Sequence, residues 1–179
     1  AGLTERYFDL SLAELKPKSN QDEAVSKVRR FYSDFIEGKN NGRNMIIAGT
    51  VGTGKTHICQ AMINDLVRLG RDVRIDTARS MIRRVRSTWE KGADMTETQV
   101  IERYSFEHEL LIIDEVGVQF GTESEQITMF DIIDGRYEER RPTILITNLD
   151  IEGLTKVIGE RVIDRLRDDG GELIAFNWE

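Results

Sequence analysis

Residues 45–56 of the chain, MIIAGTVGTGKT, decide the fold class. The apolar run Met45–Ala48 has the length of a buried strand, and apolar residues from Lys55 to Leu69 recur at helical spacing. Between them, residues 49–56 fit the phosphate-loop pattern G-x-x-x-x-G-K-[ST]. Glycines let such a loop turn tightly around phosphate oxygens, and the positive end of the following helix faces the same anion. The sequence therefore predicts a strand–loop–helix unit that binds a nucleotide.

The polar side chains of this loop have separate expected roles. Lys55 is expected to reach the β and γ phosphates, and the Thr56 hydroxyl is expected to hold Mg²⁺. The residues expected to contact the nucleotide are Gly49, Thr50, Val51, Gly52, Thr53, Gly54, Lys55, Thr56 and His57. A chance match to the pattern is uncommon, and its setting between a strand and a helix makes the nucleotide site the stronger interpretation.

Strands and helices alternate along the rest of the chain. We expect strands at residues 45–48, 73–76, 110–113, 143–147 and 172–176, and helices at 20–37, 55–69, 78–91, after 96, and at 124–139, 151–157 and 160–167. Two helix starts have the capping-box spacing, Asn20 with Glu23 and Thr96 with Gln99. The alternation predicts an α/β fold with a parallel sheet between helical layers. Residues 1–20 are expected to form an irregular arm packed on one domain, residues 21–179.

Composition excludes several classes of protein. The chain has 179 residues, of which 39% are hydrophobic and 32% charged, so it is neither a disordered tail nor a membrane protein. Its single cysteine, Cys59, excludes an internal disulfide and predicts a reducing, cytoplasmic setting. Two histidines and one cysteine are too few for an ordinary zinc site. Because the chain begins with Ala1 and has no basic apolar leader, we expect either a trimmed chain or a domain cut from a longer protein.

Polar residues follow two of the predicted strands. Asp114 and Glu115 come directly after the apolar run Leu110–Ile113. The aspartate at such a strand end suits a metal, directly or through water. The glutamate can orient and polarise a water for attack on the γ phosphate, which favours hydrolysis over transfer to a small acceptor. Asn148 follows the strand Thr143–Thr147 and is expected to bond the γ phosphate and the attacking water. The alternatives are two solvated acids in a loop and an Asx turn.

The segment GERVIDRLR, residues 159–167, places Arg161 and Arg165 on one helical face. One interpretation pairs them with the neighbouring acids Glu160 and Asp164 in weak surface ion pairs. The other delivers an arginine into the site of a neighbouring copy, where it supplies charge that the transition state needs.

Charge is unevenly distributed along the chain. Lys and Arg number 25 against 32 acids, a net charge of −7. Between Arg71 and Lys91 seven basic residues face three acids, a local charge of 7 − 3 = +4, so the remainder carries −7 − 4 = −11. Overall acidity argues against a protein that coats nucleic acid, but one basic strip permits a directional contact.

Together these motifs resemble the AAA+ ATPases, specifically the bacterial and phage helicase loaders of the DnaC type and their IstB-like relatives. The likeness covers nearly the whole chain. It is carried by GLTERYF (2–8), GTVGTGKTH (49–57), LLIIDEVGVQ (110–119), RPTILITN (141–148), GERVIDRLR (159–167) and FNW (176–178). The combination of the last two segments is far more discriminating than the phosphate loop, which many families share.

The resemblance implies a three-layer AAA+ domain with strand order 5-1-4-3-2 and an absent or minimal helical lid. It implies Mg²⁺-dependent ATP hydrolysis, weak in the isolated monomer, and loading of a hexameric DnaB-type replicative helicase onto single-stranded DNA. Asn148 would be sensor 1, and Arg165, with Arg161 as runner-up, would be the arginine finger acting in trans within a homo-oligomer. The family's helicase-gripping segment lies amino-terminal to this domain, and its sensor 2 arginine falls just beyond residue 178; neither is in this sequence.

The resemblance also assigns the basic strip to single-stranded DNA. The residues expected to contact DNA are Arg79, Arg83, Arg84, Arg86 and Trp89. Arginines would follow phosphates, and the aromatic ring would stack on a base. The competing interpretation is a helix that buries Met81, Ile82, Val85 and Trp89 beneath a solvated arginine face, and both interpretations can hold together.

Three alternative functions remain at this point. An AAA+ ATPase that assists a DNA transposase shares most of these motifs. An ATP-gated binding module would use nucleotide occupancy alone to switch a partner. A small-molecule kinase needs an acceptor pocket and usually a lid, for which the sequence has no recognisable segment.

Overall fold

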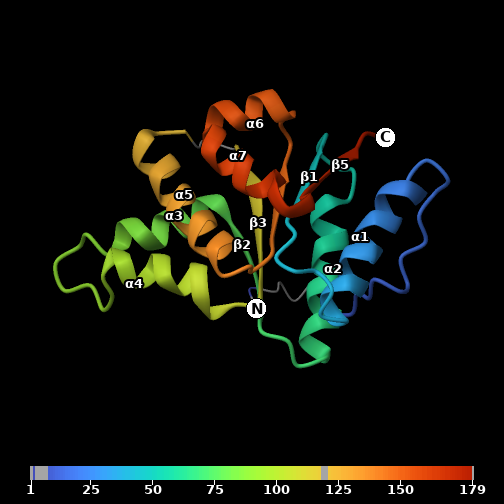
Figure 1. Cartoon of the computed structure of the whole chain (residues 1–179), viewed down its shortest axis with the longest axis horizontal. Coiled ribbons are helices and arrows are strands. Elements are labelled where there is room, and N and C mark those ends of the chain that lie inside the picture. Colours follow the sequence, from blue (N-terminus) through green and yellow to red (C-terminus); the bar gives the residue numbers. More distant parts are fainter. Residues whose placement is uncertain (1, 3–7, 118–120, 179) are drawn as a thin grey trace.

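The structure is a computed structural model that describes residues 2, 8–117 and 121–178 of the chain. Residues 3–7, 118 and 119, which belong to two of the segments that carry the family resemblance, lie outside the described residues. A central sheet separates two layers of helices (Figure 1). No helix in the described part of the chain is long and apolar enough to cross a bilayer.

The sheet has the predicted number and order of strands. The strands are β1 (Met45–Gly49), β2 (Val73–Thr77), β3 (Leu110–Val116), β4 (Thr143–Thr147) and β5 (Glu172–Phe176). All neighbours pair in parallel, in the order β2-β3-β4-β1-β5, which confirms the predicted order read from the other edge. Parallel strands covered on both faces read as continuous apolar runs, which explains why the sequence located them well.

Helices cover both faces of the sheet. One face carries α1 (Asp22–Ile36) and α2 (Lys55–Arg68); the other carries α3 (Ala78–Ser87), α4 (Glu97–Glu102), the π-helix η2 (Arg103–Glu107), α5 (Glu123–Glu138), α6 (Ile151–Ile158) and α7 (Glu160–Arg167), and the 3-10 turn η3 (Asp168–Gly170) precedes β5. Successive strand residues point to opposite faces. Ile47 therefore belongs to the core under α1 and α2, and Ile46 to the core under the remaining helices.

Two expectations about helix ends were wrong. Helix α1 begins after Gln21, not in a capping box at Asn20. Gln21 is the N-cap residue, and its side chain accepts a hydrogen bond from the Lys18 N–H and makes no capping hydrogen bond. Helix α3 ends at Ser87, four residues before the predicted end at Lys91. The Thr96 capping box with Gln99 is confirmed.

The early end of α3 moves Trp89 out of the core. Met81, Ile82 and Val85 are buried as predicted, but Trp89 lies beyond the helix and is 59% exposed. Its indole Nε1 donates a 2.6 Å hydrogen bond to Glu97 at the start of α4. The interpretation of Trp89 as a core residue is therefore wrong.

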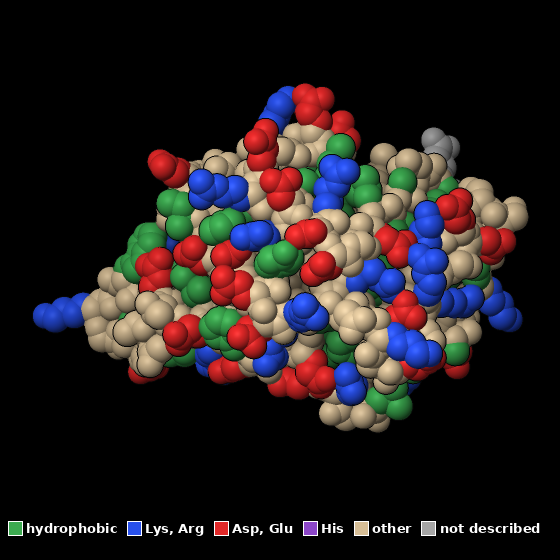
Figure 2. Space-filling model, in the orientation of Figure 1, with side chains coloured by type: hydrophobic (Ala, Val, Ile, Leu, Met, Phe, Trp, Pro, Cys, Tyr) green, Lys and Arg blue, Asp and Glu red, His purple; other side chains and the backbone are tan. Residues whose placement is uncertain are grey.

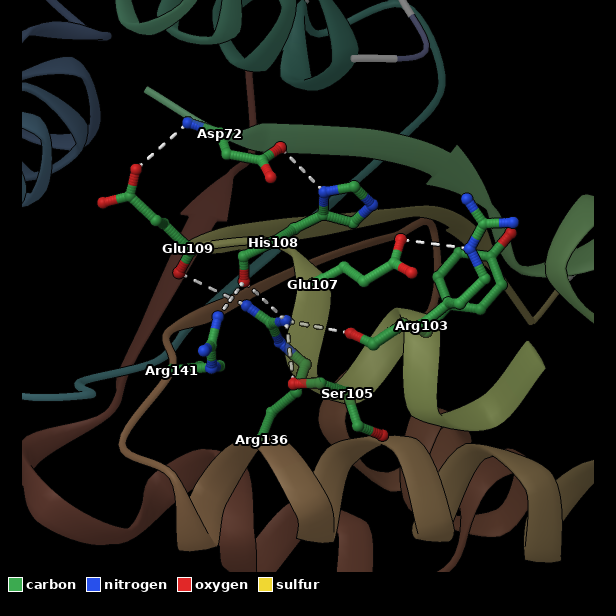
Figure 3. Close-up of polar contacts among 9 residues, drawn as sticks. Asp72, Arg103, Ser105, Glu107, His108, Glu109, Arg136 and Arg141 are labelled. Carbon is green, nitrogen blue, oxygen red and sulfur yellow. Dashed lines mark hydrogen bonds and ion pairs between the residues drawn. The ribbon is translucent and has the colours of Figure 1, made fainter. Parts of the chain in front are cut away.

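A fully buried arginine, Arg136, connects α5 to η2 and to the residues that precede β3 and β4. The Arg136 guanidinium rises from α5 toward the carbonyl oxygens that end η2 (Figure 3). It donates to Tyr104 O at 2.9 Å, His108 O at 3.1 Å and Pro142 O at 2.8 Å, and to the Thr143 hydroxyl at 3.0 Å. Burial and the nearby charge of Arg141 lower the pKa of Arg136 to about 9, so it keeps its charge at neutral pH.

Residues 8–20 have no helix or strand and run along α2. Leu12 is buried, and its N–H donates to the Asp65 carboxylate at 2.7 Å. Arg29 of α1 donates to the carbonyl oxygen of Leu15 at 2.6 Å. These contacts bring residues 15–18 close to the phosphate loop, where they help to line a cavity.

Candidate nucleotide-binding site

The phosphate loop connects the end of β1 to the start of α2. Gly49 needs to be glycine because a Cβ there would lie 2.2 Å from the Phe176 carbonyl oxygen of the adjacent strand. Gly54 caps α2 in the left-handed conformation, with φ 90°, and supplies no side chain to the helix N-terminus. The first N–H groups of α2 are therefore left for a bound anion.

Lys55 is folded back onto its own loop. Its Nζ donates to Gly49 O at 2.8 Å and to Thr50 O at 2.7 Å, and the side chain is almost fully buried. Burial lowers the pKa of Lys55, an effect that the Asp114 carboxylate partly offsets. Both partners of this ammonium are neutral carbonyl oxygens, so a phosphate offers it a stronger, charge-assisted partner.

A hydrogen bond between Thr56 and Asp114 joins the start of α2 to β3. The Thr56 hydroxyl donates to the Asp114 carboxylate at 2.8 Å. Both residues supply hard oxygen atoms, which are the ligands that Mg²⁺ prefers, and Mg²⁺ usually keeps several waters and bridges to substrate phosphates. The pair therefore fits Mg²⁺ on the donor atoms present, without needing a larger cluster of acids.

A β-bulge in β3 contains the two acids, Asp114 and Glu115. Ile113 pairs with Leu145 of β4, but the next pair is Val116 with Thr147, so β3 carries an extra residue at this point. Asp114 turns inward and its Oδ1 accepts the Glu115 N–H at 2.7 Å, whereas Glu115 is exposed and has φ 56°. Bulges and left-handed non-glycine residues concentrate at functional sites because they re-aim side chains. The bulge gives the two carboxylates different environments.

These residues line one cavity of about 550 Å³. Its lining includes Val51, Gly52, Gly54, Lys55, Thr56, His57, Asp114, Glu115 and Asn148. Asn148 is exposed at the end of β4, and within the described residues its side chain has no hydrogen-bond partner, which rules out the Asx turn. The hydroxyl of the preceding residue, Thr147, accepts the N–H of Leu149 at 3.1 Å. The structure thus brings Asn148 to the same cavity as the two acids.

A second cavity of about 370 Å³ shares residues of the phosphate loop with the first. It is lined by Gly52, Thr53, Gly54, His57 and Ile58, by Leu15–Lys18, Gln21 and Val25, and by Phe176 and Trp178. The Trp178 indole donates to Thr53 O at 3.1 Å and its ring lies 4.5 Å from that of Phe176. Sequence reasoning used FNW only as a family marker and missed this aromatic wall, because the arm and β5 meet only in the folded chain.

Arg165 contacts residues of α5 and not the acids beside it in α7. Its Nε donates to the Asp134 carboxylate of α5 at 2.6 Å, and its guanidinium lies 4.6 Å from the centre of the Tyr137 ring. In the described chain Glu160 and Asp164 form no ion pair with it, so the partners named in the ion-pair interpretation are wrong, although Arg165 does form an ion pair, with Asp134. Arg161 contacts the Phe130 ring at 5.9 Å instead.

The arginines of α3 fall into two groups. Arg84 pairs with Asp76 at 3.3 Å and Arg86 with Glu125 at 2.8 Å. Arg79 and Arg83 are exposed, and within the described part of the chain neither has an ion-pair or hydrogen-bond partner. On the face shown in Figure 2, basic and acidic side chains are interspersed rather than separated. Among the α3 arginines in the described chain, Arg79 and Arg83 therefore carry positive charge that no acid pairs with.

The fold and this cavity define a P-loop nucleotide-binding domain of AAA+ architecture. The family described as "IstB-like ATP binding protein" matches residues 13–168, and the chain belongs to this family. The earlier resemblance to DnaC- and IstB-type proteins is confirmed.

One curated relative and two solved structures extend this result. The Replicative helicase loader DnaC of Escherichia coli K12 is 35% identical over 159 residues, 89% of this chain, and the chain spans only 63% of that protein's length. The crystal structure of the DnaC helicase loader shares the fold, with a TM-score of 0.80, 22% identity and coverage of 96% of this chain and 99% of that one. Replication initiator DnaA bound to AMPPCP and single-stranded DNA has a TM-score of 0.80 and 26% identity over 99% of this chain and 51% of that chain.

Proposed function

We propose that this chain is the ATP-hydrolysing domain of a protein that loads a DnaB-type hexameric helicase onto single-stranded DNA. The observation that carries the ATPase part is the single cavity that collects Lys55, Thr56, Asp114, Glu115 and Asn148. Membership of an ATP-binding family and likeness to a helicase loader support the biological setting.

Each residue has a role that its position supports. Lys55 exchanges the loop carbonyls for the β and γ phosphates, and the N-terminus of α2 holds the phosphate oxygens. Thr56 and Asp114 would hold Mg²⁺, which when bound would neutralise charge on the phosphates. Glu115, exposed beside them, takes a proton from the attacking water, and Asn148 orients that water. The nucleoside lies in the adjoining cavity against Phe176 and Trp178.

Arg165 is proposed to complete the ATP site of a neighbouring copy. In this chain its side chain is oriented by Asp134 and Tyr137 and is partly exposed. It is therefore held at the surface, where a neighbouring copy can reach it, and is not buried in the core. An arginine supplied in trans raises phosphoryl-transfer rates by about 10³–10⁵. The isolated domain is therefore expected to bind ATP but hydrolyse it slowly, and assembly into a homo-oligomer should accelerate it.

Single-stranded DNA is the proposed nucleic-acid partner, contacted through α3. Arg79 and Arg83 carry charge that no acid in the described chain neutralises, which supports phosphate contacts there. Exposed Trp89 is available to stack on a base. The likeness to a DnaA structure bound to single-stranded DNA is consistent with this assignment.

Co-purification of the intact protein with replicative helicase tests the function. We expect capture of the host's hexameric helicase, modulated by ATP, and no capture of a DNA transposase. The IstB-like family description makes transposase assistance the specific rival. Capture of a transposase in place of the helicase contradicts helicase loading while leaving the ATPase assignment standing.

A further inference from the structure

A cavity of about 420 Å³ lies on the α3 side of the sheet and shares no residue with the two cavities at the phosphate loop. It opens between the end of α3, the connection at residues 88–96, α4 and η2. The lining residues that matter here are Arg74, Arg84, Ala93, Met95, Arg103 and Tyr104. Its volume lies in the range of small-molecule sites, about 300–1,000 Å³.

Three arginines line this cavity, Arg74, Arg84 and Arg103, together with the acids Asp94 and Glu107. Arg74 of β2 and Arg84 of α3 both reach the same oxygen of Asp76, at 2.9 and 3.3 Å. The Tyr104 hydroxyl donates to that oxygen as well, at 2.8 Å. One carboxylate therefore serves two guanidiniums. In addition, the buried Nε of Arg74 has no hydrogen-bond partner in the described part of the chain.

A third guanidinium lies at the rim. Arg103 pairs with Glu107 at 3.0 Å, an arrangement visible in Figure 3, but its side chain remains 56% exposed. Its Nη1 also lies 3.4 Å from the Met95 sulfur. The pairing is therefore a solvent-exposed one, which a stronger anionic partner can replace at little cost.

Apolar surface lies beside this charge. Ala93 and Met95 line the outer wall, and the Tyr104 ring, which is almost fully buried, forms the inner wall with Arg74 5.5 Å from its centre. Guanidinium groups match phosphate oxygens with two parallel hydrogen bonds, and apolar or aromatic walls accept the flat face of a base. The combination fits a ligand with both a phosphate and a planar ring.

We propose that this cavity binds one nucleotide unit, with its phosphate at Arg74, Arg84 and Arg103 and its base against Ala93 and Met95. The inference rests on the proposed DNA function in one respect: α3 carries both the free arginines and Arg84, so a single strand crossing α3 passes the opening. A free mononucleotide offers the same chemistry, and the experiment distinguishes the two sources.

Filling the cavity tests the proposal. Ala93 is exposed, so Ala93→Trp places a large ring in the opening without removing any arginine; Ala13→Trp, at an exposed alanine of the arm, is the matched control. Both variants and the wild-type chain are titrated with fluorescently labelled dT12, with dTMP and with ATP. We expect Ala93→Trp to bind dT12 at least about tenfold more weakly, as loss of a stacked base and its phosphate predicts, and ATP normally. Ala13→Trp should match the wild type.

The outcomes separate this site from the proposed function. If the wild-type chain binds dT12 and Ala93→Trp binds it equally well, the cavity is not the site, although DNA binding stands. If the wild-type chain does not bind dT12, the DNA part of the proposed function fails, and dTMP decides the cavity. Binding of dTMP that Ala93→Trp abolishes then supports a mononucleotide site, and absence of dTMP binding overturns it.

Discussion

The Thr56 hydroxyl donates a 2.8 Å hydrogen bond to the Asp114 carboxylate, which joins the phosphate-loop helix to the strand that carries the acids. The two oxygens come from residues 58 positions apart in sequence, and the bond places side by side two oxygen atoms of the kind that Mg²⁺ prefers as ligands. The sheet thus positions the proposed metal ligands before any nucleotide arrives.

Thr56→Val should weaken the use of Mg²⁺, because valine keeps the shape of the side chain and removes its oxygen. We expect the Mg²⁺ concentration for half-maximal ATP hydrolysis to rise at least about tenfold. Thr56→Ser, which retains the hydroxyl, should stay near the wild-type value. An unchanged Mg²⁺ dependence in Thr56→Val would remove Thr56 from the metal site.

Glu115→Gln should separate ATP binding from hydrolysis. Glu115 is exposed and its side chain makes no hydrogen bond in the described chain, so the change leaves the fold and the loop contacts of Lys55 intact. We expect a fall in kcat of about 10²–10⁴, the contribution of a general base, at nearly constant ATP affinity. Glu123→Gln, at an exposed position of α5, is the control.

The same variant distinguishes a motor-like cycle from an ATP-gated binding module. If nucleotide occupancy alone switches a partner, Glu115→Gln should support helicase loading in the ATP state as well as the wild type does. If loading needs a complete cycle of ATP hydrolysis, the variant should bind ATP but fail to complete helicase loading.

Arg83→Gln and Arg86→Gln should affect DNA binding unequally. Arg83 is free in the described chain, whereas Arg86 is bound to Glu125. The slope of log affinity against log salt is negative, and each lost phosphate contact reduces its magnitude by about 0.7 for a single strand. We expect that change for Arg83→Gln and a smaller one for Arg86→Gln, measured with dT12 over a salt series. Equal slopes for both variants and the wild type would show that α3 does not follow the phosphates.

Arg136→Met should destabilise the domain. The change removes a buried cation and strands the carbonyl oxygens of Tyr104, His108 and Pro142 that it serves. Breaking such a network costs about 3–5 kcal/mol, whereas Arg141→Gln, which loses one bond to His108 O, should cost about 1 kcal/mol. Urea denaturation of the two variants measures the difference. Similar losses for both would assign Arg136 no special role.

The sequence located most of the fold because its signals are local. Each strand is a short apolar run, and the phosphate loop carries its residues within eight positions, so neither requires knowledge of distant contacts. The features that sequence reasoning missed depend on long-range contacts. Arg165 is bound by Asp134, 31 residues away, and Trp178 reaches Thr53, 125 residues away.

Two errors have local physical causes. Trp89 continued the apolar spacing of α3, but the helix ends at Ser87, and the Thr88 hydroxyl bonds back to Val85 O at 2.6 Å. The burial of Arg136 was not anticipated because arginine is rarely buried without a carboxylate, and here its partners are mostly backbone carbonyls, which a sequence does not distinguish.

A site shared between copies is the central claim, and mixing two inactive variants tests it most directly. Arg165→Ala keeps its own phosphate loop but cannot complete a neighbour's site, and Lys55→Ala has no working site but keeps its arginine. Each alone should hydrolyse ATP slowly under assembly conditions, and an equimolar mixture should recover a substantial fraction of the wild-type rate. A mixture no faster than the average of its two components, or full activity of Arg165→Ala alone, would contradict the claim.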